Sequence, residues 1–313
     1  MPTTSCTTNT ESPGRSDSPL GRTVLIANTR SRWGRSRRTI RDAVQCLRGR
    51  SIAFTFHTTR HPGYARQTAA QAASDTDTLI VCGGDGTVNE VIDGLCSVPG
   101  ARRPRIGIIP AGSSNDIART LGIPLSPKAA CETILAGRTR AIDLGCINGR
   151  YFAMASTVGL FATIAAESNK LRGLSGAVRY VAAALKVMAV MPDPWRMTLT
   201  TDTATYEGDF GVVLVNNMPR YGGLLFQPAA DPADGLLDVL LVPPVARRKA
   251  VAMIPRVLRG RLADHPIVTA FRTATLTIRL DRPAPANNDG ECLPQLPTEI
   301  HYTTEPAAIA MLC

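Results

Sequence analysis

The chain has 313 residues, 44% of them hydrophobic, and its 35 basic and 25 acidic residues give a formal net charge of +10. This length allows two domains, and this apolar content excludes a chain that is disordered throughout. The excess of positive charge comes mainly from arginine and favours anionic partners such as phosphates or lipid headgroups.

Residues 1–21 are rich in Thr, Ser, Pro and Gly and lack the apolar segment of a signal peptide, so we expect a disordered tail there. From residue 22 onward, strand and helix patterns alternate as far as Leu135. This alternation is typical of a doubly wound α/β domain with a parallel sheet. The expected strands cover residues 23–28, 52–57, 79–82 and 106–109, and the expected helices include residues 38–47, 64–73 and 117–121.

A glycine-rich loop, GGDGT at residues 83–87, follows the third of these strands and precedes a helix. Its glycines let the backbone approach a polyanion, and the helix that follows presents free amides to phosphates. Asp85 would repel a phosphate unless a divalent cation lay between them, so the loop predicts Mg²⁺ with a nucleotide. The alternative is a plain turn that closes the strand.

A second loop, PAGSSND at residues 110–116, follows the fourth strand in the same way. Ser113, Ser114 or Asn115 could simply cap the next helix, which is what such residues usually do. Capping and phosphate binding are compatible, however. Two loops that each offer a carboxylate, Asp85 and Asp116, fit a ligand crevice at the carboxyl ends of the strands.

Beyond Ile142 the pattern changes from alternation to successive strands. We predict a second, β-rich domain that forms a sandwich of antiparallel sheets. The expected strands cover residues 151–157, 197–201, 210–216, 237–242 and 274–280, with only two helices between them, at residues 175–191 and 247–262.

The longest apolar stretch, residues 177–191, contains Arg179 and Lys186 and is too short and too charged to predict a membrane span. It indicates an amphipathic helix that packs on the core, with a lipid-facing wall as the alternative. The eight cysteines show no paired metal-ligand spacing and indicate reduced thiols. Four scattered histidines give no case for zinc. We therefore expect a cytoplasmic protein.

Two basic clusters each indicate either a solvated face or a surface for anionic headgroups. The second reading predicts peripheral contact with the inner face of a membrane. Nucleic acid is disfavoured because neither cluster carries interleaved aromatic residues. The clusters are Arg30, Arg32, Arg35, Arg37, Arg38 and Arg41, and then Arg247, Arg248, Lys249, Arg256, Arg259 and Arg261.

Together these motifs resemble the diacylglycerol kinase catalytic family, which includes bacterial lipid kinases and the sphingosine kinases. The resemblance covers nearly the whole chain after residue 22, whereas the first loop alone would also suit NAD kinases and phosphofructokinases. The segments that carry it are GGDGTVNEVIDGL at residues 83–95, IGIIPAGSSNDIARTLGIP at 106–124, AIDLG at 141–145, residues 148–151, VNNMPRYGGLLFQPAADPADGLLDVLLV at 215–242 and DGE at 289–291.

The resemblance implies an N-terminal domain like that of NAD kinases and phosphofructokinases, formed by residues 22–141 and about 303–313. Residues 142–302 would form the β-rich domain that holds the lipid acceptor. It also implies ATP as a cofactor, held by Asn28, Thr58, Thr59, Gly83, Gly84, Gly86, Thr87, Asn89, Gly112 and Ser113.

The resemblance further assigns roles to acidic residues. Asp85, Asp116 and Asp143 would form a network that positions catalytic Mg²⁺, Asp289 would be the general base, and Glu291 would lie near the nucleotide or metal. A second, structural Mg²⁺ would be held by the Asp234 carboxylate and the carbonyls of Asp231 and Leu236. Taken singly, Asp143 and Asp289 would be interpreted as ordinary acidic residues in turns, and residues 231–238 as a hairpin turn without a metal.

Two positions depart from the family pattern. Ser114 replaces a glycine in the second loop and puts a Cβ where a positive φ is expected. Thr29 replaces the proline that commonly follows Asn28.

We therefore expect an ATP- and Mg²⁺-dependent kinase that phosphorylates a hydroxyl of a lipid, with diacylglycerol as the default acceptor. A sphingoid or other lipid alcohol is the near alternative. A NAD kinase and a catalytically silent nucleotide or lipid sensor are the remaining candidates. The sequence predicts no oligomeric state.

Overall fold

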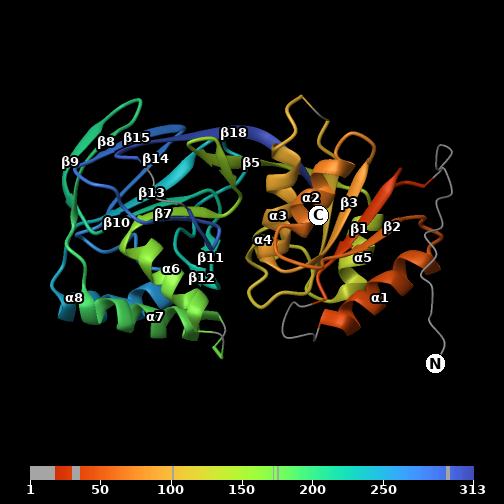
Figure 1. The fold of residues 1–313 in the computed structure, drawn as a ribbon, viewed down its shortest axis with the longest axis horizontal. Helices are drawn as coiled ribbons and strands as arrows, with labels where there is room; N and C mark the ends of the chain where they lie inside the picture. The colour runs from red at the N-terminus through yellow and green to blue at the C-terminus, as the bar shows by residue number, and fades with distance from the viewer. Residues whose placement is uncertain (1–17, 30–35, 101, 172, 175, 294–296) are drawn as a thin grey trace.

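The computed structural model describes residues 18–313 except 30–35, 101, 172, 175 and 294–296 (Figure 1). Most of the predicted tail, and Arg30, Arg32 and Arg35 of the first basic cluster, lie outside the described residues. The first half contains β1 (Thr23–Ala27), α1 (Ser36–Gly49), β2 (Thr55–Thr58), α2 (Tyr64–Ala72), β3 (Thr78–Gly83), α3 (Asp85–Cys96), β4 (Arg105–Pro110), α4 (Asp116–Thr120), α5 (Pro127–Leu135) and β5 (Thr139–Ile147).

The second half consists mainly of strands, with three helices among the described residues. It contains β6 (Arg150–Phe152), β7 (Ala155–Gly159), α6 (Leu160–Lys170), α7 (Gly176–Val190), β8 (Trp195–Thr200), β9 (Thr205–Phe210), β10 (Val212–Asn216), β11 (Arg220–Tyr221), β12 (Leu224–Leu225), β13 (Leu237–Val242), α8 (Arg247–Leu258), β14 (Thr269–Thr273), β15 (Thr275–Leu280), β16 (Ala286–Asn288), β17 (Glu291–Cys292) and β18 (Glu299–Leu312).

The N-terminal layer is a parallel sheet in the order β2-β1-β3-β4, and its inner strands are buried apolar runs such as TLIVCG in β3. Strands buried on both faces are typical of sheets covered by helices on both sides. The carboxyl ends of β3 and β4 lead directly into the two predicted loops. The α/β class predicted for this half of the chain is confirmed.

The last strand, β18, runs through both halves of the molecule (Figure 1). Its end pairs in parallel with β4 through Met311 and Leu312, while its earlier residues pair antiparallel with β5 and β15. One continuous sheet therefore connects the parallel strands β2-β1-β3-β4 to the antiparallel strands of the second half. The long pairing of β18 with β5 also fixes the orientation of the N-terminal half relative to the C-terminal half, because both strands extend from one half into the other.

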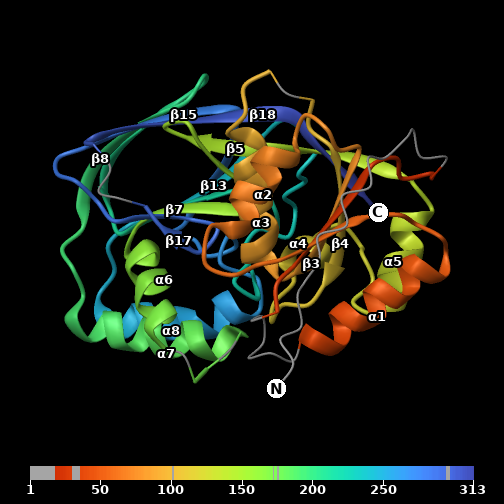
Figure 2. The ribbon, with the colours of Figure 1, turned by 45° about the vertical axis from the view of Figure 1, so that its right-hand side comes forward.

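A second antiparallel sheet, in the order β14-β13-β10-β7-β16-β17, completes the predicted sandwich. Alternate residues on its strands face opposite sides. Val158, Val213 and Val215 pack in the core between the two sheets, whereas Val212 and Leu214 face the helices α6, α7 and α8. These three helices cover the outer face of the second sheet (Figures 1 and 2). The antiparallel sandwich is confirmed.

Several predicted elements are wrong in detail; among them, the strand expected at 210–216 is divided between β9 and β10. The expected strand at residues 151–157 is split into β6 and β7, and a helix, α6, was missed altogether. It begins directly after Gly159, which has a φ of 87° and allows the chain to turn from strand to helix without a polar loop. The helix predicted for residues 247–262 ends at Leu258, because Pro255 and then Gly260, with a φ of 69°, do not continue it.

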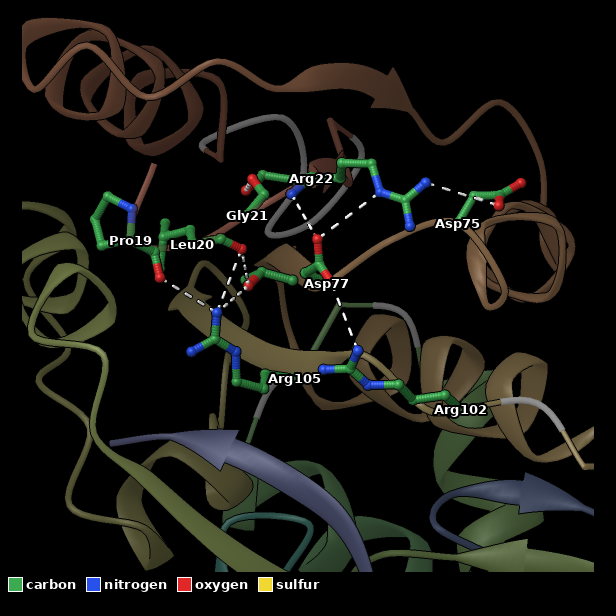
Figure 3. A network of polar contacts seen from close by, with 10 residues as sticks. Pro19, Leu20, Gly21, Arg22, Asp75, Asp77, Arg102 and Arg105 are labelled. Carbon is green, nitrogen blue, oxygen red and sulfur yellow. Dashed lines mark hydrogen bonds and ion pairs between the residues drawn. The ribbon is translucent and has the colours of Figure 1, made fainter. Parts of the chain in front are cut away.

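A polar network holds the amino ends of the parallel strands (Figure 3). The Asp77 carboxylate accepts the Arg22 backbone amide at 2.9 Å and pairs with the guanidinium groups of Arg22 and Arg102. Arg105 donates to the Leu20 carbonyl and to Thr78 Oγ1. The network ties residues 19–22 to β3 and β4 at the end of the sheet opposite the two loops, so we assign it a structural role.

Candidate active site

The two glycine loops touch backbone to backbone at the carboxyl ends of β3 and β4. A Cβ built on Gly84 would lie 2.8 Å from the Cα of Gly112, and one on Gly112 would lie 2.4 Å from the Cα of Gly84. A larger residue at either position would push the loops apart. Gly86 differs, because a Cβ there would meet nothing within 4 Å. The first turn of α3 therefore has open space beside Gly86.

The second loop is held by a side chain whose role the sequence did not reveal. Asn115 Oδ1 accepts the Gly112 amide at 2.8 Å, and Asn115 Nδ2 donates to the Gly112 carbonyl at 3.0 Å. Asn115 also takes the positive φ of the loop, 51°, which asparagine tolerates. Ser114 is not among the described residues with positive φ, so the strain expected there is absent.

Beside these loops lies a pocket lined by Asn28, Thr59, His61, Pro62, Thr87 and Glu90. Asn28 Nδ2 donates to Thr87 Oγ1 at 3.0 Å and joins β1 to α3. Thr58 ends β2 opposite Ala27, and Ser113 is exposed on the second loop. The pocket thus gathers three residues predicted to bind ATP, and it adds His61 and Glu90, which were not among the predicted site residues.

Two of the predicted metal-network acids lie close together. Asp85 Oδ1 accepts the Ile117 amide at 3.1 Å, and Asp116 Oδ2 accepts the Gly223 amide at 2.7 Å. Burial raises the pKa of Asp85, and burial followed by the charge of Asp85 raises the pKa of Asp116 to about 6. Asp116 Oδ1 is buried and has no hydrogen-bond partner among the described residues. Such a pair suits a cation.

The third predicted network acid, Asp143, lies beneath the turn at residues 231–236. Its two carboxylate oxygens accept the amides of Gly235 and Ala307, each at 2.7 Å. It therefore joins this turn to the irregularity in β18 between Glu305 and Ile309. These bonds give Asp143 a positioning role that the sequence pattern did not indicate.

The predicted structural metal site carries ion pairs. The Asp231 carboxylate contacts Arg140 and the Asp234 carboxylate contacts Arg272, while Asp234 Oδ1 accepts the Leu236 amide. The Arg272 guanidinium thus contacts the one carboxylate predicted to bind this ion, whereas the Arg140 pair involves the Asp231 carboxylate and not the Asp231 carbonyl predicted as a ligand. No cluster of three or more His, Cys, Asp or Glu side chains suited to a metal occurs in the described part of the chain. A structural Mg²⁺ at this turn stays a prediction.

Asp289 occupies the turn between β16 and β17 with a φ of 47°. Its Oδ2 accepts the Ala153 amide at 2.6 Å, and its Oδ1 accepts the amides of Met154 and Ala155 at 2.8 and 2.9 Å. Burial raises the pKa of Asp289 to about 7, although the hydrogen bonds from the three amides lower it. The charge of Asp85 adds to the rise. Since each carboxylate oxygen has two lone pairs, Oδ2 keeps one for a further proton donor.

Two neighbours tie Asp289 to the nucleotide side. Asn89 on α3 donates from Nδ2 to the Asp289 carbonyl at 3.5 Å. Partial burial of the Glu291 carboxyl on β17, followed by the charges of Glu90 and Asp93, raises its pKa. The DGE turn therefore faces α3, the helix that begins at the first glycine loop.

An apolar cavity lies on the other side of Asp289, between the second sheet and helices α6, α7 and α8. Its lining includes Phe161, Tyr180, Met188, Tyr221, Phe226 and Met253. Tyr221 connects it to the DGE turn, because its hydroxyl donates to Asn287 Oδ1 at 2.6 Å, and that oxygen also accepts the Gly290 amide. The same β11–β12 hairpin supplies the Gly223 amide to Asp116.

Comparison with known proteins identifies the class. Residues 22–147 match the family model for the diacylglycerol kinase catalytic domain, and residues 155–313 match that for the YegS C-terminal NAD kinase beta sandwich-like domain. A diacylglycerol kinase of Mycobacterium tuberculosis is 31% identical over 94% of this chain and 95% of its own length. One from Bacillus subtilis is 30% identical over 78% of this chain and 80% of its own.

A crystal structure of a diacylglycerol kinase from Bacillus anthracis shares the fold, with a TM-score of 0.73, 22% identity and coverage of 93% of this chain and 96% of that one. Fold and site together define a phosphotransferase with an alcohol group as acceptor, a lipid kinase. The chain belongs to the diacylglycerol kinase family.

Proposed function

We propose that this lipid kinase transfers the γ-phosphoryl group of MgATP to the hydroxyl of an uncharged, diacylglycerol-like lipid, with Asp289 as general base. The observation that carries this proposal is the position of Asp289. It lies between α3, which it reaches through Asn89, and the apolar cavity, which it reaches through Asn287 and Tyr221. A hydroxyl presented from the cavity would therefore meet a base beside the nucleotide loops.

The nucleotide would lie over the N-terminus of α3. Family membership implies ATP as the phosphoryl donor, and the space beside Gly86 leaves room for phosphates at the helix amides. Asn28, Thr59 and Thr87 border the adjoining pocket. The close packing of Gly84 on Gly112 holds the two loops at one spacing, which positions their amides together.

Asp85 and Asp116 would hold Mg²⁺, directly or through water. Mg²⁺ in kinases is commonly bound by one or two carboxylates together with phosphate oxygens, so two acids suffice. The unpartnered Asp116 Oδ1 and the raised pKa values of both acids fit a cation that relieves their repulsion. When bound, the ion would neutralise charge on the triphosphate.

Asp289 would take the proton of the acceptor hydroxyl at its Oδ2 as the hydroxyl oxygen bonds to the γ-phosphorus. The bond from that phosphorus to the bridging oxygen breaks, and ADP leaves with the electron pair. A base is most effective when its pKa lies near the working pH, and a pKa of about 7 meets this condition. The three amide bonds keep the carboxylate in one orientation while the proton moves.

Contact with a membrane would occur through the outer face of α7 and α8. None of the helices described is both long enough and apolar enough to span a bilayer. Yet Val178 and Leu185 on α7 and Leu258 on α8 are 64%, 47% and 46% exposed. The basic residues at both ends of α8 are exposed beside them. Since these helices also line the cavity, a lipid would pass directly from the membrane into it.

Radiolabelled ATP and a panel of lipid alcohols in detergent micelles test the proposed reaction. We expect Mg²⁺-dependent transfer to diacylglycerol. Transfer to NAD instead would identify a NAD kinase, and tight ATP binding without transfer to any lipid would identify a silent binding protein. Either result would overturn the proposal.

Sedimentation with vesicles tests the membrane face. Charge reversal at Arg256 and Arg259 should weaken binding to anionic vesicles, and added salt should weaken the binding of the unaltered protein. Arg38→Glu with Arg41→Glu on α1 is the matched control, because those exposed arginines lie on the other half of the molecule. Equal loss in both double variants would contradict a specific face.

A further inference from the structure

Two polar side chains, Thr157 on β7 and Asn287 on β16, lie buried on the two strands next to Asp289, which follows β16 and accepts the Ala155 amide of β7. They oppose each other in register across the two strands, and each has 0% of its surface exposed. Thr157 Oγ1 and Asn287 Nδ2 have no hydrogen-bond partner in the part of the chain that the structure describes. Buried polar atoms are rarely left unpaired, so this pair requires an explanation.

The orientation of the Asn287 amide is fixed by its surroundings. Its Oδ1 accepts the Gly290 backbone N–H at 3.0 Å, and a backbone N–H can only donate. Tyr221 donates to the same oxygen. The Asn287 NH₂ group is therefore left as a donor, and the Thr157 hydroxyl beside it also carries a proton to donate. Two donors that share no acceptor suit an oxygen supplied by a ligand.

The order of groups along β7 shows where that oxygen would lie. On the helix-facing side of the sheet, Gly159 pairs with the cavity-lining Val212, Thr157 pairs with Leu214, and the next residue on that side, Ala155, donates its amide to Asp289. Two residues of extended strand span about 6.6 Å. The sequence of environments is thus an apolar cavity, two donors, and then the base.

We propose that Thr157 and Asn287 bind a carbonyl oxygen of an acyl ester in the acceptor lipid, an inference that rests on the proposed function. In a diacylglycerol the acyl chain, the ester carbonyl and the free hydroxyl follow one another in the same order, and five bonds separate the carbonyl oxygen from the hydroxyl oxygen. An acyl chain in the cavity and a carbonyl on the two donors would bring the hydroxyl to Asp289. On this path the ester would pass Tyr221, which lines the cavity and donates its hydroxyl to Asn287.

The pair therefore selects acyl-ester lipids. An ether-linked dialkylglycerol has the same hydroxyl and chains but no carbonyl oxygen, and it would leave both donors unpaired. A sphingoid base presents an ammonium group, which can only donate hydrogen bonds. It would therefore face the two donors of Thr157 and Asn287 without offering them an acceptor. Discrimination by an unpaired buried group is stronger than discrimination by shape alone.

The test compares 1,2-diacylglycerol with the matching 1,2-dialkylglycerol as acceptors for the full-length protein and its Thr157→Val variant. Valine has nearly the shape of threonine and removes only the hydroxyl. We expect kcat/KM for the diester to fall about ten-fold and that for the diether to change less than two-fold. Thr157→Ser should restore the preference, because it keeps the hydroxyl.

Ser156→Ala is the matched control, since Ser156 lies on the same strand but faces the other side, where its hydroxyl bonds Tyr302 at 2.9 Å. It should affect both lipids equally. The thermal stability of Thr157→Val should stay the same or rise, because the lost hydroxyl has no protein partner.

An equal effect of Thr157→Val on the two lipids, or none on either, would overturn the inference and would indicate a buried water on the two donors, with the proposed function intact. If the unaltered protein phosphorylates neither lipid, the proposed function fails as well.

Discussion

Substitution of Gly86 by alanine should make the protein more stable and less active. Gly86 is the second residue of α3, its φ is not positive, and an added Cβ would meet no protein atom within 4 Å. Alanine is favoured over glycine within a helix by up to about 1 kcal/mol, so we expect stabilisation of about 0.5–1 kcal/mol near this end. For a protein of this size that corresponds to a rise in Tm of about 1–3 °C.

The cost should appear in nucleotide binding, because the space that receives the methyl group is the space proposed for the phosphates. A displacement of the triphosphate by about 1 Å can reduce turnover about 100-fold. Thermal unfolding with and without MgATP measures both effects: the variant alone should melt higher, and MgATP should shift its Tm less than that of the unaltered protein.

Gly49→Ala is the matched control. Gly49 ends α1, has open space at its Cβ position and lies outside the nucleotide pocket, so this variant should gain stability without loss of ATP affinity. If Gly86→Ala binds MgATP as tightly as the unaltered protein and keeps its turnover, the phosphates do not lie at the start of α3, and the proposed nucleotide site is wrong.

Three further predictions concern the acids. Asp289→Asn would place an amide NH₂ group against the Ala153 N–H and weaken the two bonds to Met154 and Ala155, so the free energy of unfolding should fall by about 1–3 kcal/mol. Turnover should fall by about 100-fold or more, whereas MgATP binding measured by calorimetry should persist. Since a base acts only when deprotonated and the pKa of Asp289 is raised to about 7, kcat/KM should rise as the pH increases from 6 to 8; a flat profile would exclude Asp289 as the base. Asp116→Asn should raise the Mg²⁺ concentration needed for half-maximal rate at least ten-fold. The Tm should change little, because the side-chain oxygen of asparagine can still accept the Gly223 amide.

The position of the two glycine loops in the fold was predictable because it is set by the local sequence. Residues 83–87 follow a buried strand and precede a helix, and the structure places them at the carboxyl end of β3, beside the second loop. The sandwich was predictable for a similar reason, since strands such as residues 237–242 are short apolar runs separated by turns.

Other features depend on contacts between distant residues and left no local signal. Helix α6 begins without a polar cap because Gly159 turns the chain, so strand and helix read as one apolar run. The loop function of Asn115 depends on its bonds to Gly112, and the positive φ fell on Asn115 rather than on Ser114.

The proposed acceptor side was the least predictable part of the candidate site. Tyr221, Asn287 and Asp116 come from three separate segments and meet only through the β11–β12 hairpin. The role of Asp143 in a metal network stays a prediction from its motif, and the sequence did not reveal that its carboxylate accepts two backbone amides, those of Gly235 and Ala307. Motif spacing gives residue types, but tertiary packing decides which partners they meet.

The most direct test of the account is the transfer of radiolabelled phosphate from ATP to diacylglycerol by the purified protein, with and without Mg²⁺, beside Asp289→Asn. We predict a labelled lipid phosphate that requires Mg²⁺ and is lost in the variant although the variant still binds ATP. Undiminished transfer by Asp289→Asn, or labelling of no lipid at all, would contradict the account.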